Sequence, residues 1–242
     1  MSGRDGRLDV GIIGAGRVGP VIAAGLAGAG HRIAGVATTS AAGRDRVEAL
    51  LGPAPILELP DLLARSDLII LAIPPDEIAP LVRGLAEAGH WRPGTLVAHT
   101  AAALGTDVLR PAVERGAIPL AIHPAIVFTG TSVDLARLRE SVCAVTAPAP
   151  VLPIAQALVV ELGSEPIVIA EADRPAYAEA IATATAFSAS IVAQSLGILA
   201  GIGVERPAGI IAPLIRSTID EALRAVPSPP PSLARAEDSP PG

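Results

Sequence analysis

Three glycines near the start of the chain have the spacing of an anion-binding turn. Gly14, Gly16 and Gly19 form the pattern G-x-G-x-x-G in "DVGIIGAGRVGPVIAAGLAGAG", after an apolar run and before an Ala-rich stretch. Gly14 would permit a tight turn, Gly16 would let a diphosphate approach the backbone, and Gly19 would let helix and strand pack closely. The diphosphate would lie at the helix N-terminus, where unpaired N–H groups favour an anion. The predicted dinucleotide contacts of this turn are Gly14, Ala15, Gly16, Arg17, Val18 and Gly19; the alternative is a turn that binds nothing.

The next apolar run ends in hydroxyl groups instead of an acid. In "GVATTSAAGR" it is followed by Thr38, Thr39 and Ser40, and the first charge is Arg44. A carboxylate at this position holds the ribose 2′-OH of NAD, whereas hydroxyls and an arginine accept the 2′-phosphate of NADP. The sequence therefore favours NADP, with NAD as the alternative. The competing interpretation is that Arg44 is an ordinary solvated residue in a helix.

Two of the four histidines follow apolar runs that we expect to be strands. His99 follows residues 95–98 and His123 follows residues 117–122, and Pro124 would bias the backbone of His123 toward extended geometry. Imidazole, with an ordinary pKa of ~6.5, can exchange a proton with an alcohol or ketone oxygen. His99 and His123 are the predicted catalytic residues, with structural histidines as the alternative. His31 and His90 are expected at the surface.

The segment "IPPDE" closes another apolar run at the same expected edge. Ile73, Pro74 and Pro75 are predicted to line the nicotinamide side of a dinucleotide, although a plain turn would also explain the prolines. Thr100, next to His99, is assigned to the same set of cofactor contacts. No metal site is predicted.

Strands and helices that could position these residues alternate through the first part of the chain. Almost wholly apolar runs are typical of parallel strands covered on both faces, and their alternation with helices predicts a doubly wound, mostly parallel α/β sheet. The expected strands are 8–13, 32–37, 67–73, 95–98, 117–122, 141–146 and 166–170. The expected helices are 18–29, 42–51, 76–88 and 154–162.

The pattern changes near residue 172, after which no strand is expected. We predict a dinucleotide-binding domain over 1–171, a small, truncated all-helical domain over 172–226, and a disordered Pro-rich tail over 227–242. Residues 181–204 carry no charge and are long enough to span a bilayer. Their hydroxyl and glycine content and the lack of flanking Lys/Arg favour a helix buried in a homodimer over a membrane span.

Composition excludes several classes of function. The net charge is −6 and all 18 basic residues are arginine, without a basic cluster, so neither a nucleic acid nor a membrane is an expected partner. The absence of lysine excludes Schiff-base chemistry and a lysine acid or base. Cys143 lies in an apolar run and is expected to be a buried structural residue. The first residues lack the apolar core of a signal peptide, which predicts a cytoplasmic protein.

Five segments resemble one family. They are "VGIIGAGRVG", "LIILAIPPDEI", "GTLVAHTAAALGTDVL", "IPLAIHPAIVFTG" and "YAEAIATATAFSASIVAQSLGIL", and together they extend over residues 8–224. The chain resembles Rossmann-like proteins with a C-terminal domain of unknown function, within the 6-phosphogluconate-dehydrogenase-like superfamily. The resemblance implies an N-terminal NAD(P) domain and a helical domain that dimerises and helps to enclose the site.

The sequence also departs from this family. Ala101 and Ala102 stand where the family has Ser-Gly, an Asn is expected near Ala189, and the helical domain is shorter than the family's. Two functions stay open at this point. One is an NADP-dependent oxidoreductase acting on a small polar keto or hydroxy substrate, and the other is a non-catalytic or regulatory NAD(P)-binding protein of the same fold.

Overall fold

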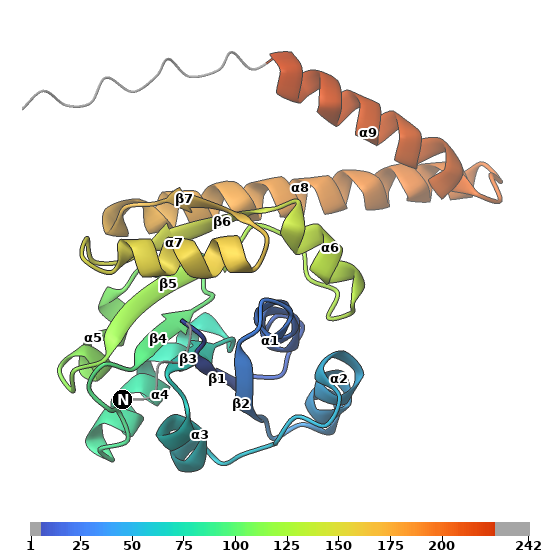
Figure 1. The fold of residues 1–242 in the computed structure, drawn as a ribbon. Helices are drawn as coiled ribbons and strands as arrows, with labels where there is room; N and C mark the ends of the chain where they lie inside the picture. The colour runs from blue at the N-terminus through green and yellow to red at the C-terminus, as the bar shows by residue number, and fades with distance from the viewer. Residues whose placement is uncertain (1–5, 226–242) are drawn as a thin grey trace, which may run out of the picture. The chain divides into compact units, whose positions relative to one another are not determined.

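Seven strands form one sheet in the computed structural model, which describes residues 6–225 (Figure 1). The strands are β1 (Asp9–Ile13), β2 (Arg32–Ala37), β3 (Leu68–Leu71), β4 (Leu96–His99), β5 (Ile118–Pro124), β6 (Val142–Thr146) and β7 (Glu165–Val168). Their spatial order is β2-β1-β3-β4-β5-β6-β7, and every neighbouring pair is parallel except β5 and β6. The predicted fold class, a doubly wound and mostly parallel sheet followed by helices, is confirmed.

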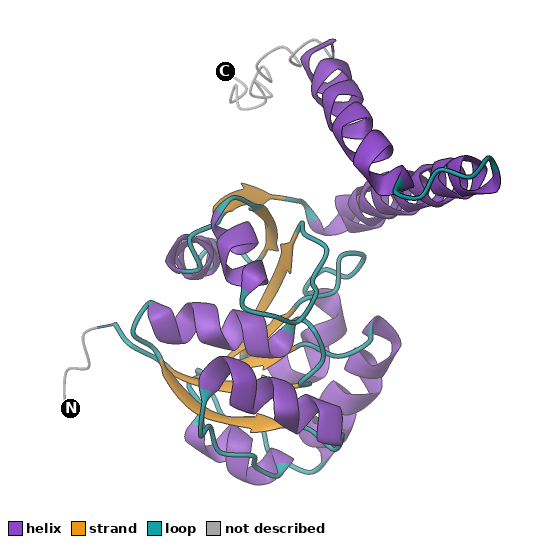
Figure 2. Cartoon of the chain, turned by 90° about the vertical axis from the view of Figure 1, so that its right-hand side faces the viewer, coloured by secondary structure: helices purple, strands orange, loops and turns teal. Residues whose placement is uncertain are grey.

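Helices cover both faces of the twisted sheet (Figure 2). They are α1 (Gly19–Gly28), α2 (Ala41–Leu51), α3 (Leu59–Arg65), α4 (Pro75–Glu87), α5 (Arg110–Val113), α6 (Val133–Arg139) and α7 (Leu152–Glu161), with 3-10 turns η1 (Asp107–Leu109) and η2 (Glu171–Asp173). Side chains alternate along a strand, so in β3 Ile70 joins the core under α1 and α7, whereas Ile69 and Leu71 join the core under α3 and α4. Both faces are buried, which explains the unbroken apolar runs.

Several boundaries differ from the sequence-based expectation. His99 and His123 lie inside β4 and β5 instead of after them, because the ladders continue: His99 pairs with Ala121 and Leu71, and His123 pairs with Ala144 of β6. The antiparallel pairing with β6 extends β5 as far as Pro124. The short helices α3, α5 and α6 were not predicted, because four to seven residues carry too little periodicity.

His31 is a second difference, because it is buried and not a surface residue. Its Nδ1 accepts a hydrogen bond from the Leu8 N–H at 3.0 Å, and its Nε2 lies 2.8 Å from Glu161 Oε2. The imidazole therefore links the residue before β1 to the last residue of α7, and these two are far apart in sequence.

Two further helices follow the sheet, α8 (Arg174–Gly201) and α9 (Pro207–Ala225), as the sequence predicts. The chain divides into two compact units after Ile181; the boundary expected near residue 172 stays a prediction, and the predicted tail 227–242 lies outside the described residues. Large apolar side chains of α8 and α9 are more than half exposed, namely Phe187, Ile191, Ile198, Ile210, Leu214 and Leu223. The segment Glu171–Gly201 is long and apolar enough to cross a membrane by length and composition.

Candidate active site

The glycine turn between β1 and α1 has the geometry that each glycine implies. Gly14 has φ +101°, a conformation that side chains rarely adopt, and its N–H donates to Ala37 O at 3.0 Å. A Cβ on Gly14 would collide with the carbonyl of Ala72, and one on Gly19 would collide with the carbonyl of Gly14. A Cβ on Gly16 would meet nothing within 4 Å. A side chain at position 14 or 19 would therefore clash with the backbone, whereas the space beside Gly16 is free of protein atoms.

The first turn of α1 is available to an anion. The N-cap residue is Val18, which offers no side-chain cap, and Pro20 has no N–H to satisfy. The helix dipole places partial positive charge at this end. The open position at Gly16 and the uncapped helix together form a cradle into which a diphosphate fits.

A cavity of about 400 Å³ lies on one side of this turn. Gly14, Thr38, Thr39, Arg44 and Ile73 line it, as do Glu58 and Glu77. The two acids come from the start of α3 and from α4, so the end of β2 itself carries no carboxylate.

The residues after β2 have unequal roles. The Ser40 hydroxyl accepts from the Gly43 N–H at 3.0 Å and so caps α2. Arg44 is exposed, and its Nη2 donates to Thr39 O at 3.4 Å. Arg46, which was not predicted, donates from Nη1 to the carbonyl of Ala15 at 3.1 Å. Nothing in the glycine pattern identifies Arg46; its position two residues after Arg44 on the first turns of α2 was the available signal.

The second cavity, of about 250 Å³, lies at the ends of β4 and β5. Arg17, Val18, Thr100 and His123 line it together with residues 124 and 126–128. The glycine turn, residues 38–44, residues 73–75, the pair His99–Thr100 and His123 therefore all lie along the carboxyl edge of the sheet. Pro74 and Pro75 begin α4, and Ile73 lines the first cavity and not the second.

His123 is held by a tyrosine that the sequence analysis did not identify. Its Nδ1 lies 2.9 Å from Tyr177 Oη, and the two rings meet edge to face with centroids 5.6 Å apart. Burial first, and then the positive charge of Arg174 and the neighbouring His99, lower the pKa of His123 to about 4. His123 is therefore neutral near pH 7, with Nε2 as the ring nitrogen left for a ligand.

His99 is fully buried and uses both ring nitrogens within the protein. Nδ1 accepts from the Ala101 N–H at 3.3 Å, so Nε2 carries the proton and donates to Gly105 O at 2.7 Å. Burial lowers its pKa to about 4, although the bond to Gly105 acts in the opposite direction. This arrangement gives His99 a positioning function for the turn after Thr100, and its part in proton transfer stays a prediction.

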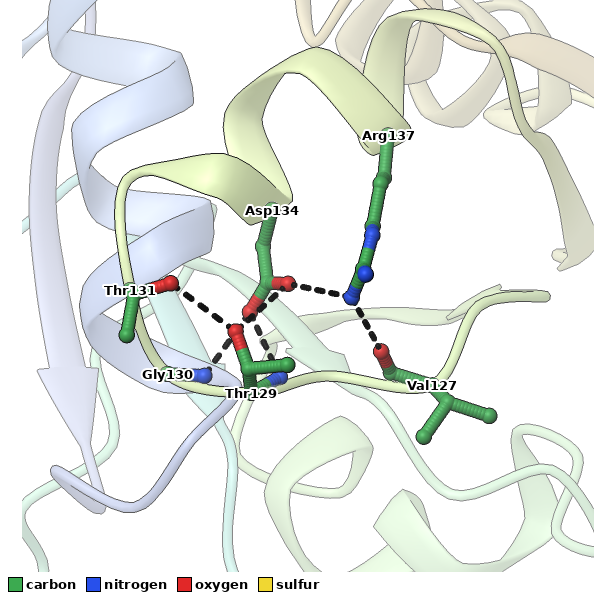
Figure 3. Close-up of polar contacts among 6 residues, drawn as sticks. All are labelled: Val127, Thr129, Gly130, Thr131, Asp134 and Arg137. Atoms are coloured by element: carbon green, nitrogen blue, oxygen red, sulfur yellow. Dashed lines mark hydrogen bonds and ion pairs between the residues drawn. The ribbon is translucent and has the colours of Figure 1, made fainter. Parts of the chain in front are cut away.

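Asp134 organises the loop that forms one wall of the second cavity (Figure 3). Its Oδ2 accepts from the N–H groups of Thr129 and Gly130 at 2.7 and 2.8 Å, and its Oδ1 accepts from the Thr129 hydroxyl at 3.0 Å. Burial would raise the pKa of Asp134, but these hydrogen bonds outweigh it and lower the pKa. Gly130, with φ +81°, lies against Arg17, so the loop is fixed directly beside the glycine turn.

Comparison with known sequences divides the chain into two matched regions. The family described as a Rossmann-like domain matches residues 2–124, about half of the chain, and the domain of unknown function DUF2520 matches residues 141–229. No curated protein matches the sequence significantly.

Solved structures share the fold at low sequence identity. A candidate NADP oxidoreductase from Bacteroides fragilis superposes with a TM-score of 0.72 at 20% identity, covering 91% of this chain and 82% of the other. A 1-pyrroline-5-carboxylate reductase from Streptococcus pyogenes gives 0.68 at 20% identity, with coverage of 97% and 86%. Pyrroline carboxylate reductase from Plasmodium falciparum, with NADP bound, gives 0.65 at 13% identity, with coverage of 94% and 82%. At these identities the likeness establishes the fold.

Proposed function

Because the chain belongs to the Rossmann-like domain family and carries a DUF2520 domain, we propose that it is an NADP-dependent oxidoreductase acting on a small polar keto or hydroxy compound. The observation that carries this proposal is the pair of cavities on either side of the glycine turn. One contains the hydroxyl groups and Arg44 that follow β2, and the other contains His123. A dinucleotide lying across the turn would reach both. Among the solved structures named above, one is described as a candidate NADP oxidoreductase and another is a reductase with NADP bound, and both agree with this class.

The chain's own groups suit NADP. Because the Gly14 N–H is bonded to Ala37 O, the backbone N–H groups from Ala15 to Gly19 would hold the diphosphate. Thr38, Thr39 and Arg44 would receive the 2′-phosphate, with Arg46 close to the turn as a second guanidinium. The end of β2 carries no carboxylate that would repel that phosphate, and the two acids of the same cavity, Glu58 and Glu77, come from the start of α3 and from α4. NADPH, when bound, supplies the hydride.

His123 would serve the reacting oxygen of the substrate. In the tautomer that this role requires, the Tyr177 hydroxyl donates to Nδ1, and the proton on Nε2 would lie toward a ligand in the second cavity. A neutral imidazole can donate this proton to the oxygen as it gains negative charge. Thr100 and the loop fixed by Asp134 would restrict the cavity to a small substrate.

The proposal is tested by mixing the full-length protein with NADPH and a panel of small 2-keto acids, ketones and imines, and following absorbance of the reduced nicotinamide. We expect substrate-dependent loss of absorbance with at least one compound, and little with NADH. A protein that binds NADPH tightly but turns over nothing would favour a regulatory NADP-binding protein instead.

We further propose that the chain is a homodimer through its helical part, as the resemblance implies. The exposed apolar side chains of α8 and α9 are too numerous to leave in water. Their burial against a second copy would also cover the uncharged part of α8, residues 181–201, without a membrane. Recovery from the soluble fraction without detergent is the corresponding expectation.

A further inference from the structure

Arg174, the first residue of α8, carries a fully buried guanidinium. Nε donates to the Thr146 hydroxyl at 2.7 Å, and Nη2 donates to the carbonyls of Ala121 and Ala144 at 2.9 and 3.2 Å. These acceptors are neutral, and among the residues that the structure describes Nη1 has no hydrogen-bond partner. The nearby Glu171 instead accepts from the N–H groups of Thr106 and Asp107. A buried cation without a paired carboxylate is costly to the fold, and it therefore calls for an explanation.

Tyr177 lies one helical turn after Arg174 and links it to His123. The guanidinium carbon is 5.9 Å from the centre of the tyrosine ring, and the tyrosine hydroxyl is 2.9 Å from His123 Nδ1. The three side chains therefore form a row that begins at the buried charge and ends at the second cavity. The other charged or titratable groups that act on this row are Cys143 on Tyr177, His99 on His123 and Glu171 on Arg174.

We propose that Tyr177 replaces the proton that His123 gives to the substrate, and that Arg174 stabilises the phenolate left behind. This rests on the proposed function. As the carbonyl carbon receives a hydride, the Nε2–H bond of His123 breaks and the proton joins the carbonyl oxygen. The Tyr177 O–H bond then breaks and that proton joins Nδ1, which leaves a neutral imidazole and a phenolate beside Arg174. A solvent water afterwards gives a proton to Nε2 and departs as hydroxide, and Nδ1 returns its proton to Tyr177.

The positive charge of Arg174 disfavours an imidazolium on His123 and favours a phenolate on Tyr177. His123 is neutral near pH 7 and lies close to Arg174, so a positive charge on its ring would be repelled by the guanidinium. A negative charge on Tyr177 would be attracted. Burial raises the pKa of Tyr177, and the Arg174 charge offsets part of that rise. A fixed charge placed where charge develops needs no reorganisation during the reaction. Arg174 would act as a positioning residue through its charge, without touching the substrate.

The chain has one tyrosine, so its ionisation can be read alone. We would titrate the tyrosinate absorption band of the full-length protein saturated with NADP⁺, in the wild type, in Arg174→Gln and in the matched control Arg83→Gln, which changes an exposed arginine of α4. Removing an opposite charge at this range should raise the pKa of Tyr177 by about 1 unit or more in Arg174→Gln only. Equal pKa values in all three proteins would overturn the proposal.

Turnover separates the proposal from the function on which it rests. With a substrate found in the panel, Tyr177→Phe should lower kcat by ~10- to 100-fold while KM for NADPH stays unchanged, because the proton is no longer replaced. Unchanged kcat would overturn the relay and leave the oxidoreductase standing. If the pKa of Tyr177 shifts in Arg174→Gln but no compound is turned over, the proposed oxidoreductase activity is refuted. The electrostatic effect of Arg174 on Tyr177 is then still supported. If Arg174→Gln does not fold, Arg174→Lys retains the charge and should keep kcat within ~10-fold; a loss as large as that of Tyr177→Phe would contradict the role of the charge.

Discussion

Replacing Asp134 with Asn tests whether a buried carboxylate holds the loop beside the glycine turn. Asn keeps the size of the side chain and one carbonyl oxygen, which can still accept from the N–H groups of Thr129 and Gly130. The Thr129 hydroxyl can reverse and accept from the new amide. The substitution therefore removes charge from the contacts while it leaves them in place.

The magnitude follows from the contacts. Hydrogen bonds to a charged group contribute ~1.5–3 kcal/mol and neutral ones ~0.5–1.5 kcal/mol, so two bonds that lose their charge cost about 2 kcal/mol. The ion pair with Arg137, at 3.3 Å and with a half-exposed guanidinium, adds less than ~1 kcal/mol. We expect Asp134→Asn to lower the free energy of unfolding by about 2–3 kcal/mol.

Asp107 supplies a matched control. It pairs with Arg110 at the same i,i+3 spacing and at 3.4 Å, but its side chain is 74% exposed, whereas that of Asp134 is 0% exposed. Asp107→Asn should therefore change the free energy of unfolding by less than ~0.5 kcal/mol. Denaturant titration of the three proteins at pH 7 measures both values. Equal losses in the two variants would refute the burial argument.

The pH dependence gives an independent check with a defined sign. The pKa of Asp134 is lower in the folded protein than in the unfolded chain, where a carboxyl titrates near ~3.9. Its contribution is therefore present above that value and is lost as the pH falls through the folded pKa. The difference between wild type and Asp134→Asn should be constant from pH 7 to about 5 and shrink below ~4. A difference that does not change with pH would mean that the charge of Asp134 is unimportant.

Three other predictions concern the cofactor, the chemistry and the assembly. Gly16→Val should abolish NADP(H) binding in calorimetry with almost no change in melting temperature, because its Cβ meets no protein atom within 4 Å but would enter the space for the diphosphate; retained binding would remove the phosphate-loop assignment. His123→Ala should leave NADP affinity within a few-fold and lower turnover by ~10²–10⁴, whereas joint loss of melting temperature and cofactor affinity would indicate a packing residue. Light scattering of detergent-free protein should give a dimer, and a monodisperse monomer would contradict the use of α8 and α9 as an interface.

The sequence predicts those parts of the site whose geometry is local. The tight turn at Gly14 and the close packing at Gly19 depend on a few adjacent residues, and the structure has both; the contact of Gly16 with a diphosphate stays a prediction. The sheet class was also predictable, because strands buried on both faces must be apolar throughout. The carboxyl edge of the sheet then brought His123 and Thr100 to one cavity.

The remaining parts depend on contacts between distant segments. Tyr177 meets His123 from 54 residues away, and nothing in the pattern of α8 distinguishes that tyrosine from a core residue. The burial of Arg174 likewise arises only when α8 begins above β5 and β6. Asp134 looks like an ordinary acid at the start of a short helix until the loop before it folds back onto the carboxylate.

The most direct test of the central claim is a calorimetric titration of the full-length protein with NADPH and with NADH under the same conditions. Charged hydrogen bonds from one or two arginines to the 2′-phosphate should contribute ~1.5–3 kcal/mol, which corresponds to roughly 10- to 150-fold tighter binding of NADPH. Arg44→Ala and Arg46→Ala would assign that preference to one guanidinium or to both. Equal affinity for the two nucleotides, tighter binding of NADH, or binding of neither would contradict the account.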